Sequence, residues 1–188
     1  AGWTRPLIEA AYRMDVEELP RLVISDRVPM PMVCGLARPV IVMPAAAAEW
    51  TDGRRRAVLC HELAHLLRRD LVVNLLGRVA CILHWFNPLA WFAAWRLRIE
   101  SERACDDMVL EVGTRPSEYA DHLLQIVCAA SWARTPGVAL PMAERRVFEG
   151  RMLAILEKDA RRAGPSLRQV AAAAVLAVVV AMPVAAMG

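Results

Sequence analysis

Two histidines and a glutamate lie close together in the run His61-Glu62-Leu63-Ala64-His65. Residues four apart share one face of a helix, so the two imidazoles could bind one tetrahedral Zn²⁺. Glu62 could then take a proton from an attacking water and pass it to a leaving amine. The motif can occur by chance, but here it falls in a helical stretch with regularly spaced apolar residues. We therefore interpret His61 and His65 as metal ligands and Glu62 as the general base of a zinc endopeptidase.

Such a site needs a third protein ligand, and two glutamates follow downstream. Glu100 and Glu102 point in nearly opposite directions on a helix, so at most one of them faces the metal. Glu102 has Asp106 four residues later on the same face, and that carboxylate could hydrogen-bond the free N–H of a ligand histidine. Either glutamate could instead pair with a surface arginine. The pattern of two histidines and one glutamate favours Glu102 as the ligand.

Other residues with chemical potential carry a weaker signal. His84 and His122 are interpreted as surface or hydrogen-bonded histidines rather than ligands. Cys60 and Cys105 are interpreted as small buried apolar residues, and Asp70 as a helix cap or ion-pair acid. The five cysteines include no CxxC pair, which excludes a zinc ribbon and argues against a disulfide framework.

The elements that must position these residues are mainly helical. Periodicity and capping residues predict helices over residues 2–19, 52–69, 70–83, 89–110, 117–130 and 143–162. Three short β-prone runs, at residues 22–24, 32–34 and 40–43, predict a small sheet. Prolines among these runs favour edge strands. The expected fold class is α+β, with the sheet over about 21–44, the active-site helices over about 52–111 and the peptidase domain over 1–163.

Apolar residues make up 57% of the 188-residue chain, more than a soluble domain usually contains. Residues 170–186 contain no charged side chain, which predicts a transmembrane helix within 166–188. Arginines precede this run, so the positive-inside rule places the peptidase domain in the cytoplasm. Polar interruptions in residues 71–95 favour a helix pair that is buried or abuts the membrane. Because the chain begins at Ala1, we expect a fragment that lacks upstream membrane spans.

The net charge of +3 is too small to indicate a nucleic-acid partner. The arginine clusters are short and are not interleaved with aromatic residues, as a base-stacking surface would require. We therefore expect no direct binding to nucleic acid.

Four segments together resemble a known family. They are PMVCGLARPVIVMP at residues 31–44, HELAHLLRRD at 61–70, HWFNPLAWFAAWRLRIESERACDDMVL at 84–110 and SEYADHLLQI at 117–126. In this order they resemble the BlaR/MecR antirepressor family of membrane zinc metallopeptidases.

The resemblance implies a gluzincin-type zinc peptidase domain on the cytoplasmic side of the bacterial cell membrane. It implies zinc ligation by His61, His65 and Glu102, catalysis by Glu62, and Asp106 as a support for a ligand. It also implies that the substrate lies along an edge strand formed by Pro39, Val40, Ile41, Val42 and Met43.

The resemblance further implies a signalling protease that cleaves a cytoplasmic transcriptional repressor and, during activation, itself. Residues 134–141 and 144–150 are the segments expected to be cleaved. Two alternatives remain open. One is a housekeeping membrane protease of the CAAX-processing or heat-shock kind. The other is an inactive transducer with structural zinc, although a structural site has no need of the general base that Glu62 provides.

Overall fold

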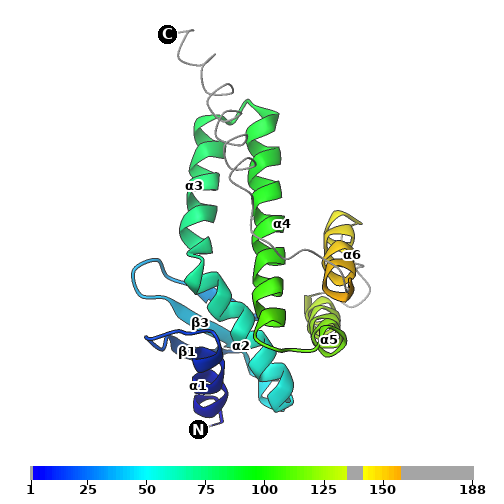
Figure 1. The fold of residues 1–188 in the computed structure, drawn as a ribbon. Coiled ribbons are helices and arrows are strands. Elements are labelled where there is room, and N and C mark those ends of the chain that lie inside the picture. The colour runs from blue at the N-terminus through cyan, green and yellow to red at the C-terminus, as the bar shows by residue number, and fades with distance from the viewer. Residues whose placement is uncertain (1, 135–141, 158–188) are drawn as a thin grey trace. The chain divides into compact units, whose positions relative to one another are not determined.

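The computed structural model describes residues 2–134 and 142–157, which belong to one compact unit, residues 1–157. Helices dominate, and one small sheet accompanies them (Figure 1). The elements are α1 (Thr4–Arg13), β1 (Arg21–Ser25), β2 (Met32–Cys34), β3 (Val40–Pro44), the 3₁₀ helix η1 (Ala45–Glu49), α2 (Asp52–Leu67), α3 (Asp70–Leu83), α4 (Pro88–Glu111), α5 (Pro116–Arg134) and α6 (Met142–Leu156). The expected α+β class is confirmed. Within the described residues, the three predicted strands are present, and so are the helices predicted between residues 2 and 157, although α1 is shorter than expected.

The three strands form a mixed sheet in the order β1-β3-β2. β3 pairs in parallel with β1, with Leu22 opposite Ile41, and antiparallel with β2, with Val33 also opposite Ile41. Ile41 and Met43 on β3 are fully buried. The prediction that residues 39–43 form an exposed edge strand is therefore wrong, because strands flank β3 on both sides. Within the described chain, β2 lies at one edge of the sheet and contacts α2.

Helix α2 begins where the sequence predicts, because the Thr51 side chain accepts a hydrogen bond of 3.3 Å from the Arg54 amide. Its apolar residues Leu59 and Leu63 are fully buried among the residues of the hydrophobic core. Helices α1, α3, α4 and α5 all contact α2. The segment His61–His65 therefore lies on a helix that contacts four other helices.

Arg69 separates α2 from α3 with a left-handed backbone, φ 55°. This break lets α3 leave in a new direction and pack against α4 (Figure 1). Helix α4 begins at Pro88, where a proline costs no hydrogen bond, and the Asn87 side chain accepts from the Leu89 amide at 3.0 Å. The long α4 thus reaches from the tip of the α3–α4 pair down to α2.

Three expectations fall partly or wholly outside the described residues. The transmembrane helix at 166–188 lies outside them, as do the end of the domain predicted over 1–163 and most of the segment 134–141. Residues 144–150 lie within α6 and are helical. Among the described helices, none combines the length and apolar character needed to cross a bilayer.

Candidate metal centre

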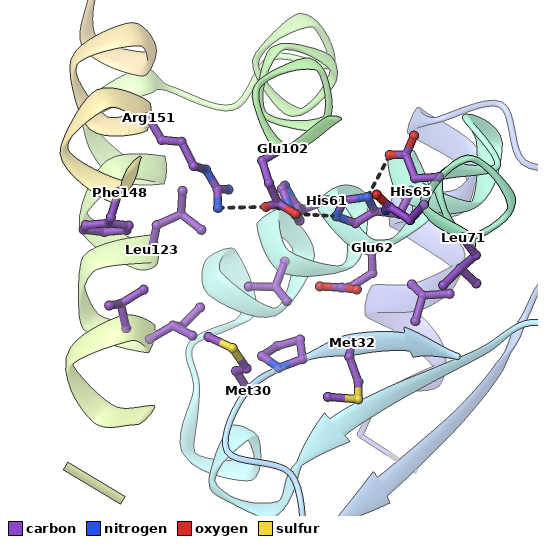
Figure 2. A pocket seen from close by; sticks show the side chains of 17 residues that line it. Met30, Met32, His61, Glu62, His65, Leu71, Glu102, Leu123, Phe148 and Arg151 are labelled. Carbon is purple, nitrogen blue, oxygen red and sulfur yellow. Dashed lines mark hydrogen bonds and ion pairs between the residues drawn. The ribbon is translucent and has the colours of Figure 1, made fainter. Parts of the chain in front are cut away.

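Three chemically reactive side chains project from one side of α2 into a cavity of about 310 Å³. His61 and Glu62 are buried, at 7% and 6% exposure, and His65 is partly buried. The two imidazole rings lie 4.8 Å apart between centroids and nearly perpendicular to each other. Figure 2 shows the Glu62 carboxylate pointing into the cavity, toward Met32 of β2. One helical turn thus supplies two imidazoles and one carboxylate to the same space.

Glu102 on α4 faces this turn of α2. Its Oε2 lies 3.6 Å from Nε2 of His61, and its Oε1 lies 3.6 Å from Nε2 of His65. Ligand atoms of a tetrahedral zinc site are separated by about 3.3 Å when the bonds measure about 2.0–2.1 Å. The three side chains therefore leave room for one ion with only small adjustments, and they form a group able to hold a metal.

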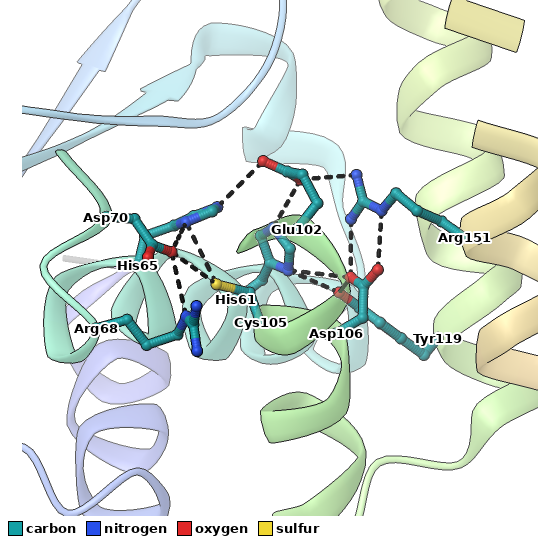
Figure 3. Close-up of polar contacts among 9 residues, drawn as sticks. All are labelled: His61, His65, Arg68, Asp70, Glu102, Cys105, Asp106, Tyr119 and Arg151. Carbon is teal, nitrogen blue, oxygen red and sulfur yellow. Dashed lines mark hydrogen bonds and ion pairs between the residues drawn. The ribbon is translucent and has the colours of Figure 1, made fainter. Parts of the chain in front are cut away.

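The second nitrogen of His61 is held by a buried relay. Its Nδ1 lies 2.9 Å from the Tyr119 hydroxyl and 3.3 Å from Oδ1 of Asp106 (Figure 3). The Tyr119 hydroxyl donates its one proton to Asp106 at 2.7 Å, so it accepts from His61. This arrangement keeps a proton on Nδ1 of His61 and leaves Nε2, the atom that would bind a metal, facing Glu102.

His65 is oriented in the same way by different residues. Its Nδ1 donates to Oδ2 of Asp70 at 2.9 Å, and the Cys105 thiol donates to the same oxygen at 3.3 Å. Arg68 adds a longer contact to Asp70, at 3.4 Å. Both histidines thus present Nε2 to Glu102 while Nδ1 binds an acceptor, which is the usual arrangement for metal-ligating histidines.

His65, Asp70 and Cys105 form a second group whose donor atoms lie close together. The separation of 2.9 Å between His65 and Asp70 is that of a hydrogen bond and is shorter than the spacing between zinc ligands. Burial and the charge of Asp70 also raise the pKa of the Cys105 thiol far above its usual range, which keeps it protonated. This second group is therefore better suited to support His65 than to hold an ion.

Arg151 on α6 joins the two carboxylates of α4. Its Nε and Nη2 donate to the two oxygens of Asp106, both at 2.8 Å, and its Nη1 donates to Oε2 of Glu102 at 2.8 Å. Asp106 and Arg151 are largely buried, with side-chain exposures of 3% and 15%. This two-pronged contact fixes the position of Asp106 and ties α6 to the cluster.

The charges of the cluster favour a cation between the histidines and Glu102. Burial lowers the pKa of His61, but contacts with Asp106 and Glu102 outweigh burial and raise it to about 10. Burial likewise favours the neutral form of Glu102, but His61 and Arg151 outweigh it and hold this pKa at about 2. Burial lowers the pKa of His65. The carboxylates therefore attract a positive charge that a metal ion could supply.

Glu62 differs from the other carboxylates of the site. Burial raises the pKa of Glu62 to about 7, and the charge of Glu102 adds to this effect while His61 opposes it. A carboxyl group with a pKa near neutrality can both take and release a proton, as a general base that later acts as an acid must do.

The remaining walls of the cavity are mostly apolar. Figure 2 shows Met30 and Met32 on one side, and Leu123 of α5 and Phe148 of α6 on another. Arg151 also lines this cavity, beside Glu102. The cavity therefore combines one polar wall, which carries the histidines and carboxylates, with apolar walls that could accept side chains of a peptide.

The structure brings His61, His65, Glu62, Glu102 and Asp106 together, as the sequence predicts, while their roles remain predictions. Three candidates lie elsewhere. Glu100 is half exposed and pairs with Arg96 at 2.6 Å and with Arg103 at 3.4 Å, and neither His84 nor His122 lines the cavity.

The predicted substrate strand, residues 39–43, does not line the cavity either; Met32 and Val33 of β2 do. Sequence reasoning missed Tyr119 and Arg151 and underestimated Asp70 and Cys105. Each of these two residues lies in a helical stretch, and nothing in the local sequence indicates that Tyr119 contacts His61 or that Arg151 contacts Glu102.

A helix bearing His61, Glu62 and His65 that faces a glutamate on a second helix defines a metallopeptidase-like domain. The sequence pattern of the family described as BlaR1 peptidase M56 matches residues 3–155. The chain therefore belongs to this family, a conclusion that confirms the expected resemblance.

Individual relatives agree with this assignment. The chain is 35% identical over 92 residues to "Regulatory protein BlaR1" of Bacillus licheniformis, which covers 47% of this chain and 15% of that protein. It is 33% identical over 104 residues to "Methicillin resistance mecR1 protein" of Staphylococcus aureus, which covers 54% of this chain and 18% of that protein. The matched part thus spans less than a fifth of either relative.

Proposed function

We propose that this chain is a zinc-dependent endopeptidase in which His61, His65 and Glu102 hold the metal. The observation that carries the proposal is the pair of 3.6 Å distances from Glu102 to the two Nε2 atoms, with both Nδ1 atoms bound to acceptors. A zinc ion held by these three residues would act as a Lewis acid, which would polarise the peptide carbonyl and lower the pKa of a bound water.

Glu62 is the proposed general base. Its carboxylate lies in the cavity beside His61, takes the proton of the attacking water, and delivers it to the amine that leaves when the peptide bond breaks. The pKa of about 7 suits both steps at neutral pH. The apolar cavity walls lower the local dielectric constant and so strengthen the electrostatic interactions at the reacting atoms.

The proposed substrate is an extended segment of protein that adds to the free edge of β2. Met32 and Val33 of β2 line the cavity, so a strand paired with this edge passes in front of Glu62. Leu123 and Phe148 offer an apolar surface to one substrate side chain. Backbone pairing then supplies affinity, and this apolar surface supplies selectivity.

The proposed role is regulated proteolysis at the bacterial cell membrane, with a cytoplasmic repressor as substrate and self-cleavage as part of activation. The relative named a regulatory protein supports a signalling role. The uncharged run at residues 170–186, preceded by Arg161, Arg162 and Arg168, supports membrane attachment with the zinc site in the cytoplasm.

The test uses a peptide library prepared from a digested bacterial proteome, with new amino termini identified by mass spectrometry. Wild-type protein should generate them, and Glu62→Gln should generate them at least a thousandfold more slowly with the same zinc content. Glu100→Gln is the matched control, because Glu100 is a half-exposed carboxylate of α4, and it should behave as wild type. Equal activity of wild type and Glu62→Gln would refute the mechanism, and zinc binding without any cleavage would favour an inactive transducer.

A further inference from the structure

Helices α3 and α4 form a hairpin that extends away from the sheet (Figure 1). The two helices approach closely where their side chains are small: a Cβ on Gly77 would lie 3.7 Å from Leu97 and 3.8 Å from Ala94. Nearer the tip, the Cys81 thiol donates to the Ala90 carbonyl at 3.5 Å. These contacts define the inner face of the hairpin.

The outer faces of this hairpin are apolar and exposed. More than half of the large exposed apolar side chains in the described residues lie between Val72 and Leu97. On α3 they include Leu76 and Leu83, which lie on the side of the helix away from Gly77. The tip carries Trp85, at 73% exposure. Such an area is far larger than single exposed apolar residues on a soluble surface, and it indicates a missing apolar partner.

Charges are distributed along the hairpin in a way that matches a membrane surface. Residues 71–95 contain no acidic residue, and Arg78 is their only arginine or lysine. The Cα–Cβ bond of Arg78 tilts toward the start of α3, so its side chain can extend toward the base of the hairpin. At that base stand Arg69 and Arg98, both exposed. Basic residues at the base complement anionic lipid headgroups.

Many polar groups at the tip of the hairpin form hydrogen bonds with other groups of the same turn. The Trp91 indole donates to the Trp85 carbonyl at 3.0 Å, and the Asn87 side chain accepts from the Leu89 amide at 3.0 Å. The amides of Asn87 and Ala90 also bind carbonyls within the turn, at 2.9 and 3.1 Å. A turn that enters lipid must meet this requirement, because hydrocarbon offers no hydrogen bonds.

We propose that the α3–α4 hairpin inserts into one leaflet of an anionic lipid bilayer. Helix α3 has 14 residues and measures about 21 Å, which is close to the depth of one leaflet with its headgroups and too short for the whole bilayer. A protein partner would cover one side, whereas the exposed apolar residues occupy the outer faces of both helices. Lipid hydrocarbon surrounds both faces at once.

Insertion places the metal centre beside the membrane. Glu102 follows Trp95 on α4 by seven residues, which corresponds to about 10 Å along the helix axis. With the apolar part of the hairpin in lipid, the cavity lies just above the headgroups. Substrate segments close to a membrane surface would therefore reach the cavity, and segments held far from the membrane would not.

The test measures the depth of a nitroxide label on the full 188-residue chain in vesicles of phosphatidylcholine and phosphatidylglycerol. The label is attached to Leu83→Cys at the tip, and Leu124→Cys on α5 is the matched control, since both leucines are exposed. Both variants also carry Cys34→Ser and Cys128→Ser, which remove the exposed native thiols. Collisions with oxygen, which concentrates in lipid, are compared with collisions with a water-soluble nickel chelate.

The label at Leu83 should collide with oxygen several-fold more than with the nickel chelate, and the label at Leu124 should show the reverse. Strong nickel collisions at Leu83 would place the tip in water and overturn the proposal. A Leu83 label shielded from both reagents would show a protein cover and would also overturn it. Unchanged zinc binding in both variants serves as the check on folding, and neither outcome depends on peptidase activity.

Discussion

Tyr119 offers the clearest test of the support around His61. Its hydroxyl accepts from His61 and donates to Asp106, and its side chain is fully buried. The change Tyr119→Phe removes one oxygen atom and leaves the ring in place. His61 then retains Asp106 as its acceptor, at the longer distance of 3.3 Å.

The expected loss follows from which contacts remain. Removing a residue that hydrogen-bonds a ligand histidine lowers metal affinity by about 10- to 100-fold. Because His61 keeps its contact with Asp106, we expect Tyr119→Phe to lower zinc affinity by about tenfold, the smaller of these losses. The lost hydrogen bond to a charged group should lower the free energy of unfolding of the metal-free protein by about 1.5 kcal/mol. Asp106 keeps both bonds from Arg151, so a larger loss is not expected.

Two assays separate these effects: zinc affinity by competition with a chelator, and urea unfolding of the metal-free protein. Tyr12→Phe is the matched control, because Tyr12 is the other tyrosine of the chain and is 87% exposed. It should change neither quantity. If Tyr119→Phe keeps zinc affinity within twofold of wild type, the relay does not support the metal site.

Three further predictions concern the other contacts of the cluster. Asp70→Ala should weaken zinc binding by about 10- to 100-fold in the same competition assay, because Asp70 orients the second ligand histidine; unchanged affinity would leave Asp70 a simple ion-pair acid. Glu102→Ala should abolish tight zinc binding by metal analysis while Glu100→Ala leaves about one equivalent bound, and the opposite result would exchange their roles. Arg151→Ala should lower the free energy of unfolding by about 3 kcal/mol in urea, because Asp106 then lacks its buried cation, and Arg151→Lys should recover only part of it.

Local spacing made much of the site predictable. His61 and His65 are four residues apart on one helix, and so are Glu102 and Asp106, so helical geometry alone places each pair on one face. The supporting residues depend instead on how distant helices pack. Tyr119 lies 58 residues from His61, and Arg151 lies 45 residues from Asp106. No periodicity in the sequence specifies such contacts.

The sheet shows where a sequence rule was given too much weight. Prolines near residues 39–44 favoured an edge strand, but Pro39 precedes β3 and Pro44 ends it, so neither interrupts the pairing of Val40 to Met43. The continuous apolar run Val40-Ile41-Val42-Met43 was the better signal, because a strand that is paired on both sides and buried or partly buried at every residue needs no polar alternation. β2, with three residues, is the strand left at the cavity.

X-ray absorption at the zinc edge tests the central claim most directly, because it identifies the atoms bound to the metal. The account predicts nitrogen and oxygen neighbours only, at about 2.0–2.2 Å, with the multiple scattering of two imidazoles from His61 and His65. A sulfur neighbour at about 2.3 Å would contradict it, since sulfur would place the metal in the group of His65, Asp70 and Cys105.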